Sequence, residues 1–154
     1  MKPEKQLEEI FRKSVSTTYG ARAFFRKTHG DMFTGAGTPD FVGHIYGACV
    51  ELELKVHPGV FSQLQKNNIR DVAASGGFSG GILQYESSYY FLSPMHVYDF
   101  SYRSRPSWVP LPLYRMTTRN GLENRLNLAP LTMLVTMHIT AMQARKHVND
   151  PIEE

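Results

Sequence analysis

The stretch GTPDFVGHIYGACVELELK, residues 37–55, joins a proline–acid pair to a run in which charged and apolar residues alternate. Side chains at alternate positions of a β-strand share one face of the sheet. Glu51, Glu53 and Lys55 are therefore expected on one face, with the valines and leucines between them on the other. Taken alone, this pattern is typical of any strand with one solvated face, so the surrounding chain has to show whether it marks a functional site.

Asp40 lies at the start of a short strand expected at 41–43, and an antiparallel neighbour would bring its carboxylate close to Glu53. Two carboxylates and a main-chain carbonyl form an oxygen-lined site that suits Mg²⁺ or Mn²⁺. Lys55 would add a cation able to hold a water or a phosphate oxygen. The approach to this site is expected to be open to a bulky substrate because small residues surround it, namely the glycines at 35, 37, 43 and 47.

Apolar periodicity and turn residues outline the elements on either side. Helical spacing predicts a first helix over 3–17 and a second one from 61 to 76. Strands are expected at 21–28, 41–43, 48–56 and twice within 80–93. The order of helix, three strands, helix and two strands indicates an α/β fold in which helices flank a mixed sheet.

The character of the chain changes after Pro94. Residues 94–127 contain five arginines interleaved with aromatic residues, and we expect an extended, loop-like segment. A last helix is expected over about 128–147, and its apolar residues surround most of its circumference, which favours burial against the core or a second copy of the chain. The methionines at 133, 137 and 142 follow helical spacing and are interpreted as packing residues.

Length and composition set broader limits. With 154 residues the chain is expected to form one domain, 1–154, that buries a sizeable core without extra cross-links. Its single cysteine, Cys49, excludes an internal disulfide and favours a reducing compartment. We expect a cytoplasmic protein without a membrane span, since the charged amino terminus lacks the apolar run of a secretory signal. The net charge of +3 and the pI near 9.0 favour a polyanionic partner.

Three motifs, taken in order, resemble those of the PD-(D/E)xK nuclease superfamily. G-x-P-D, E-x-K and S-x-x-Q appear here as GTPD (37–40), ELK (53–55) and SQLQ (62–65), the last at the start of an expected helix. The likeness covers about residues 4–93 and is greatest to VRR-NUC-type nucleases and related Holliday-junction resolvases. It implies a restriction-endonuclease-like core of order αβββαβ, to which this chain adds a C-terminal helix.

The resemblance also implies a divalent-metal phosphodiesterase. In such enzymes the residues that match Asp40 and Glu53, together with the backbone carbonyl of the residue that matches Leu54, bind Mg²⁺ or Mn²⁺. Many members add a glutamate from the first helix. Glu4 and Glu8 are both candidates here, because they lie one turn apart on that helix.

The remaining catalytic positions are Lys55 and Gln65. The resemblance implies that Lys55 positions or activates the attacking water, and that Gln65 helps to hold the lysine, a water or the substrate phosphate. The hypothesis is therefore a DNA endonuclease that acts on branched or duplex DNA as a homodimer, with the last helix as the dimer contact. The alternative is a catalytically inactive nucleic-acid-binding protein of the same fold.

Basic residues outside the motifs are candidates for DNA contact. In the segment after Pro94, arginines would bind phosphates while Tyr102 or Trp108 stack on exposed bases. A second interpretation, which the sequence favours equally, is a basic surface loop whose aromatic residues pack on the core. The candidate DNA-binding residues are Arg22, Arg26, Lys27, Arg103, Arg105 and Arg115.

Overall fold

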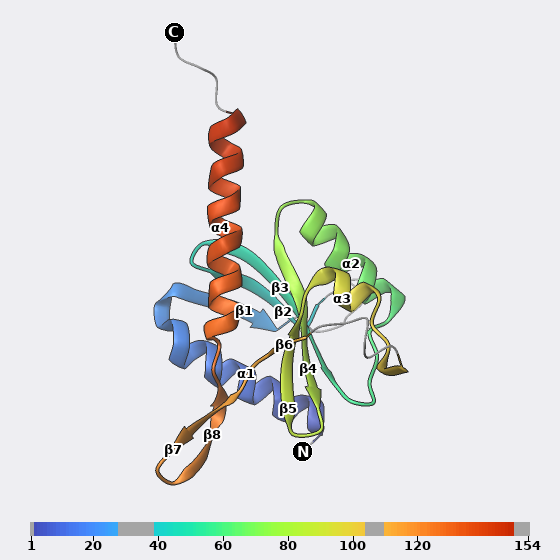
Figure 1. The fold of residues 1–154 in the computed structure, drawn as a ribbon, viewed down its shortest axis with the longest axis vertical. Helices are drawn as coiled ribbons and strands as arrows, with labels where there is room; N and C mark the ends of the chain where they lie inside the picture. Colours follow the sequence, from blue (N-terminus) through green and yellow to red (C-terminus); the bar gives the residue numbers. More distant parts are fainter. Residues whose placement is uncertain (1, 28–38, 104–109, 150–154) are drawn as a thin grey trace.

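The computed structural model describes residues 2–27, 39–103 and 110–149, and a mixed β-sheet forms its centre (Figure 1). The helices are α1 (Pro3–Tyr19), the short 3₁₀ helix η1 (Gly20–Arg22), α2 (Gln63–Ala74), α3 (Pro94–Tyr98) and α4 (Ala129–Asn149). The strands are β1 (Ala23–Lys27), β2 (Phe41–Ile45), β3 (Ala48–Val56), β4 (Phe78–Tyr85), β5 (Ser88–Leu92), β6 (Leu111–Pro112), β7 (Arg115–Thr118) and β8 (Gly121–Leu126).

The six-stranded sheet has the order β1-β2-β3-β4-β5-β6. All described pairs in it are antiparallel except β3 with β4, which run parallel. A parallel pair requires a crossover connection, and α2 provides it. The predicted α/β fold with its αβββαβ core and additional C-terminal helix is thereby confirmed.

The alternation along β3 separates a core face from a polar face. Leu52 and Leu54 are buried in a cluster that includes Phe11 of α1, whereas Glu53 faces the side on which α2 packs. Ser14 fixes α1 to the neighbouring hairpin, because its hydroxyl oxygen accepts the backbone N–H of Leu126 at 2.7 Å. The sheet is therefore covered by α1 on one face and by α2, over β3 and β4, on the other.

The expectation of a loop-like segment over 94–127 is wrong for most of its described part. It contains α3, the edge strand β6 and the β7–β8 hairpin. A hairpin signal was present in the dipeptide Asn120-Gly121, whose glycine adopts a φ of +118°. Tyr102 packs edge-on against His57 and donates its hydroxyl to the carbonyl oxygen of Gly59 at 2.6 Å, so its ring belongs to a packed cluster.

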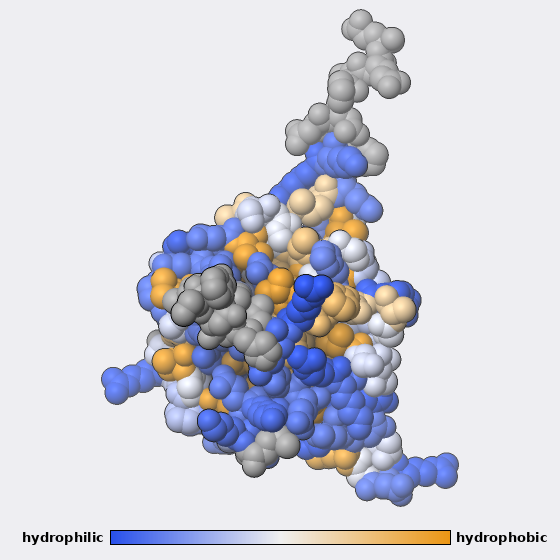
Figure 2. Space-filling view, turned by 180° about the vertical axis from the view of Figure 1, so that it is seen from behind, coloured by the Kyte–Doolittle hydropathy of each residue, from blue (hydrophilic) through white to orange (hydrophobic). Residues whose placement is uncertain are grey.

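The helix α4 packs on the body through its first half and then extends beyond it (Figure 1). Leu131 and Val135 are fully buried, and the Tyr19 and Thr132 hydroxyls form a hydrogen bond of 2.9 Å. Met133 and Met137 are 56% and 61% exposed, so within one chain the interpretation of these two as packing residues is wrong, whereas Met142, 38% exposed, lines a cavity together with Gly76. Hydrophobic residues gather where α4 leaves the body, and hydrophilic ones cover its far end (Figure 2).

In the described part of the chain, no helix combines the length and the apolar character that a bilayer crossing demands.

Candidate active site

Asp40 and Glu53 meet where β2 begins beside β3. The antiparallel register places Phe41 opposite Leu52, so Asp40 and Glu53 are the next residues along the two strands. The Asp40 backbone N–H donates to Glu53 Oε2 at 3.1 Å. The Leu54 backbone N–H donates to Asp40 Oδ2 at 2.9 Å. Each carboxylate is thus held by the backbone of the neighbouring strand, and the two acidic groups converge.

The Leu54 carbonyl oxygen lies on the same side of β3 as the Asp40 carboxylate. In an antiparallel ladder the N–H and C=O of one residue face the same neighbour. Because the Leu54 N–H is bonded to Asp40, its carbonyl faces that way as well. Two carboxylates and a carbonyl are the hard oxygen donors that Mg²⁺ and Mn²⁺ prefer, so the donor set fits such an ion.

Glu53 is buried to an unusual degree for an acidic residue. Only 2% of it is exposed, and the pKa of its carboxyl is raised to about 9, first by burial and then by the adjacent Asp40 carboxylate. The Lys55 ammonium, 3.8 Å from Glu53 Oε1, acts in the opposite direction without cancelling the effect. Glu53 consequently keeps its proton at neutral pH unless a further cation replaces that proton.

Gln65 connects the start of α2 to the acidic pair. The Ser62 side chain accepts the Gln65 backbone N–H at 3.1 Å, and Gln65 Oε1 accepts the Ser62 backbone N–H at 2.8 Å. This reciprocal pair is a capping box, which explains the S-x-x-Q spacing on structural grounds. The other end of the same amide, Nε2, donates to Glu53 Oε1 at 2.7 Å. One side chain therefore both caps the helix and orients the buried carboxylate.

The two first-helix glutamates lie near the pair but outside direct contact with it. A cavity of about 260 Å³ opens beside Asp40 and Leu54, and both Glu4 and Glu8 line it. Glu8 is engaged by Lys27, whose Nζ lies 2.6 Å from Glu8 Oε1. Among residues 2–27, 39–103 and 110–149, no three His, Cys, Asp or Glu side chains are gathered closely enough to hold a metal ion.

The basic residues of β1 and η1 occupy three different environments. Arg22 stacks over the Tyr46 ring at 5.5 Å, and Arg26 lies 5.7 Å from the centre of the Phe24 ring. Lys27 is the partner of Glu8 and lines the cavity beside Asp40. Of these three, Lys27 is therefore the one that the structure places next to the acidic pair.

The described arginines after Pro94 have no contact with the acidic pair. Arg103 is exposed beyond α3. Arg115 uses its Nε to donate to the Glu123 carbonyl oxygen at 3.1 Å across the β7–β8 hairpin. Arg105 and Trp108 lie outside the described residues. No described contact links this segment to Asp40 or Glu53.

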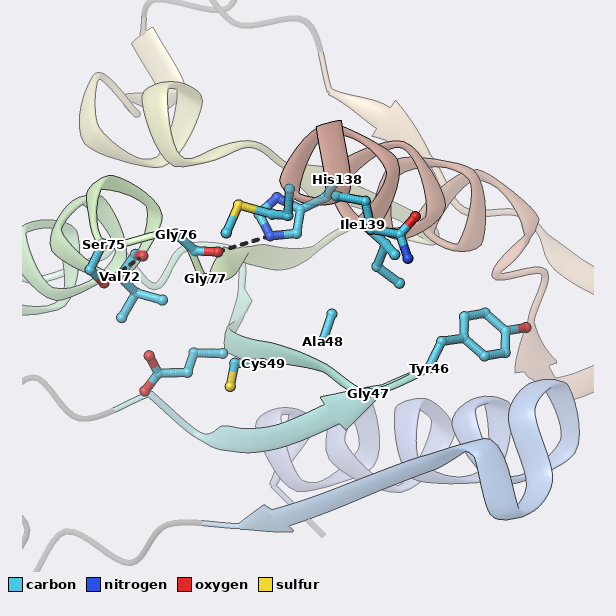
Figure 3. Close-up of a pocket in the computed structure, with 13 residues that line it drawn as sticks. Tyr46, Gly47, Ala48, Cys49, Val72, Ser75, Gly76, Gly77, His138 and Ile139 are labelled. Carbon is cyan, nitrogen blue, oxygen red and sulfur yellow. Dashed lines mark hydrogen bonds between the residues drawn. The ribbon is translucent and has the colours of Figure 1, made fainter. Parts of the chain in front are cut away.

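A larger cavity, of about 560 Å³, lies at the other end of β3 (Figure 3). It is bounded by the β2–β3 turn, the end of α2 and α4, where His138 Nε2 and the Gly76 carbonyl oxygen are 3.0 Å apart. Glu51 lines it, and burial raises the pKa of this carboxyl. Asp40, Glu53 and Lys55 do not line this cavity. The acidic pair therefore lies outside the larger of the two cavities.

Two further residues near the site were not identified correctly from the sequence. Asn68 is one: its Nδ2 is buried and lacks a hydrogen-bond partner in the part of the chain that the structure describes. It lies three residues after Gln65, a spacing that places both on one face of α2. The other is Gly43, where a Cβ would come within 1.8 Å of the Phe24 carbonyl oxygen. That glycine is required by the close approach of β1, and does not serve to keep the site open.

Comparisons with known proteins give similarity at the level of structure only. No family model matches the chain, and no curated protein matches it either. Among solved structures, it is similar to Hjc, a Holliday junction resolvase from the archaeal hyperthermophile Archaeoglobus fulgidus. The TM-score is 0.42 at 13% sequence identity, over 57% of this chain and 77% of that chain. A likeness of this degree assigns no role to any residue of the site.

Proposed function

We propose that this protein is a divalent-metal-dependent nuclease that hydrolyses phosphodiester bonds in DNA. The observation that carries the proposal is the convergence of Asp40 and Glu53 at the β2–β3 junction, with the Lys55 ammonium beside them. Clustered carboxylates repel phosphate unless a cation neutralises them, so a protein that only binds DNA gains nothing from them. The order of the three sequence motifs supports the same reading.

Each residue has a separate task in this proposal. Asp40, Glu53 and the Leu54 carbonyl would hold Mg²⁺ or Mn²⁺, with Glu4 or Glu8 as a further ligand. When bound, such an ion lowers the pKa of a coordinated water and stabilises the charge that grows on the phosphate. The Lys55 ammonium orients the attacking water or a phosphate oxygen. Gln65 keeps Glu53 in position through the hydrogen bond between the two side chains.

The substrate proposed is branched DNA, cut by a homodimer. A two-fold dimer places two identical sites symmetrically, as paired cuts on two strands require. The exposed methionines of α4, Met133 and Met137, lie one turn apart on the side of the helix opposite the buried Leu131 and Val135. They form an apolar stripe suited to a second copy of the same helix.

A cleavage assay tests the proposal. The protein is incubated with Holliday junction, flap, duplex and single-stranded DNA, with Mg²⁺, with Mn²⁺ or with a chelator. We expect cleavage that requires one of the two ions and is fastest on a branched substrate. Binding without cleavage under every condition would establish the alternative, an inactive nucleic-acid-binding protein of the same fold.

The dimer contact gives a separate prediction. Met137→Glu should shift the protein from dimer to monomer, because the change places a charge in the apolar stripe of α4 while leaving the buried side of the helix intact. Light scattering after gel filtration measures the mass. Met95→Glu is the matched control, since Met95 is 72% exposed on α3. A wild-type protein that elutes as a monomer would contradict the proposal.

A further inference from the structure

We infer that the face of β1 and β2 on which Phe24 and Arg26 are exposed holds an unpaired base of the DNA strand that is cut, with Phe24 as the stacking surface and Arg26 as a phosphate contact. This inference rests on the proposed nuclease function and specifies which part of the substrate lies beside the acidic pair. It concerns the part of the polar sheet face that α2 leaves uncovered.

The strand register places Phe24 on the same face as Glu53. Phe24 is paired with His44, and His44 with Cys49. Directly paired residues point to one side of the sheet, and the Cys49 sulfur lies 3.6 Å from His44 Nε2, as that arrangement requires. Cys49 and Glu53 are four residues apart on β3, so their side chains point to the same side.

Phe24 is exposed although its neighbour in the sequence is a core residue. Phe25 points to the α1 side, where its ring packs against Phe11 and Phe41 at centroid distances of 6.2 Å. Phe24 points away from that core and is 59% exposed. An aromatic ring in mid-strand is normally buried because it contributes a large apolar area. More than half of Phe24 is therefore accessible, next to the Arg26 guanidinium.

Arg26 provides the charge that the aromatic ring lacks. It is exposed, and its guanidinium carbon lies 5.7 Å from the centre of the Phe24 ring. Binding sites for single-stranded DNA combine basic side chains that follow the backbone with aromatic rings on which bases stack. Arg26 and Phe24 supply one of each at adjacent positions of the same face.

The distance to the acidic pair suits a continuous strand of DNA. Four residues along β3 correspond to about 13 Å, and the two strand spacings from β1 to β3 add about 10 Å sideways. An extended strand of a few nucleotides spans this diagonal. A duplex keeps its bases stacked on one another, so only an unpaired base can use the ring. The face therefore favours substrates with a single-stranded segment next to the cut.

The experiment measures DNA binding in a variant that is expected to cleave DNA slowly. In the Lys55→Ala background, fluorescence anisotropy gives the affinity for a short labelled single strand and for the same sequence as a duplex, both with Mg²⁺. Phe24→Ala should weaken single-strand binding by about 5-fold to 150-fold, and duplex binding by less than about 2-fold. Phe24→Trp should restore single-strand affinity. Leu122→Ala, a matched change at a residue 63% exposed on β8, should leave both affinities unaltered.

Several outcomes would overturn the inference. Equal losses on both DNA forms, or no loss on either, would remove the base-stacking role while the nuclease proposal still stands on its cleavage assay. A change in elution volume with Phe24→Ala would show that the ring contacts a second copy of the chain instead. Absence of DNA binding and of cleavage in the wild-type protein would refute the proposed function, and this inference with it. Thermal unfolding confirms that each variant is folded.

Discussion

Replacing Lys55 with alanine should slow metal-dependent DNA cleavage by about 100-fold to 10,000-fold, the range expected for loss of a group that positions or activates a reactant. The Lys55 ammonium lies 3.8 Å from Glu53 Oε1, and its side chain is only 16% exposed. It is therefore held at the acidic pair, where the proposed function places the attack on the phosphate. The alanine variant keeps the backbone of β3 and both carboxylates.

Single-turnover cleavage of a labelled branched substrate measures this effect. DNA affinity should change far less than the rate, because the lysine acts mainly on the reacting groups. Lys13→Ala is the control, because Lys13 is an exposed lysine on α1. This variant should cleave DNA at the wild-type rate. A Lys55→Ala rate within about 10-fold of wild type would show that the residue is not part of the catalytic group.

The acidic pair illustrates how far the sequence leads. Alternation along 48–56 is enough to assign Glu53 and Leu54 to opposite faces, because the side-chain period of a strand is fixed. The pairing of Asp40 with Glu53 follows once the short preceding strand is taken as antiparallel, and the structure has that register. Both inferences need only local geometry.

Other features depend on how elements pack, and local patterns do not determine that. The spacing of Met133 and Met137 fits a buried helix face, but the packing of α4 turns Leu131 and Val135 to the core and leaves the two methionines on the opposite side. Phe24 and Phe25 are chemically identical in the sequence, and only the position of α1 decides which ring enters the core. The depth of Glu53, and hence its protonation, arises because α2 closes over it through Gln65.

The metal-free protein should lose stability as the pH rises from acid to neutral. Glu53 has a pKa of about 9 in the folded protein, against an ordinary value of 4.5. Between these two values the folded protein holds a proton that the unfolded chain has released, so stability falls as pH rises through this window. At about 1.4 kcal/mol for each pKa unit, Glu53 makes the folded state about 3 kcal/mol less stable at pH 7 than at pH 4.5.

Glu53→Gln should remove this pH dependence, because an amide does not titrate. Its Nε2 can donate to the Asp40 carboxylate and its Oε1 can still accept from Gln65, while the Asp40 backbone N–H loses Glu53 Oε2 as its acceptor at every pH. With a chelator present, the variant should be more stable than wild type at pH 8, and the difference should shrink by about 4 kcal/mol on acidification to about pH 5. Urea unfolding at the two pH values measures it, and Glu9→Gln, a change at an exposed glutamate of α1, should behave as wild type.

Adding Mg²⁺ or Mn²⁺ should reverse the order of the two proteins. A ligand that binds only the folded state stabilises it in proportion to the logarithm of its concentration. Wild type should gain stability as the ion takes the place of the Glu53 proton, whereas Glu53→Gln should gain little because it has lost one of the two carboxylates. If both proteins respond equally to the ion, the binding site lies elsewhere. If wild type shows no pH dependence beyond that of the variant, Glu53 is ionised in the folded protein, and the Lys55 ammonium alone suffices to balance the pair.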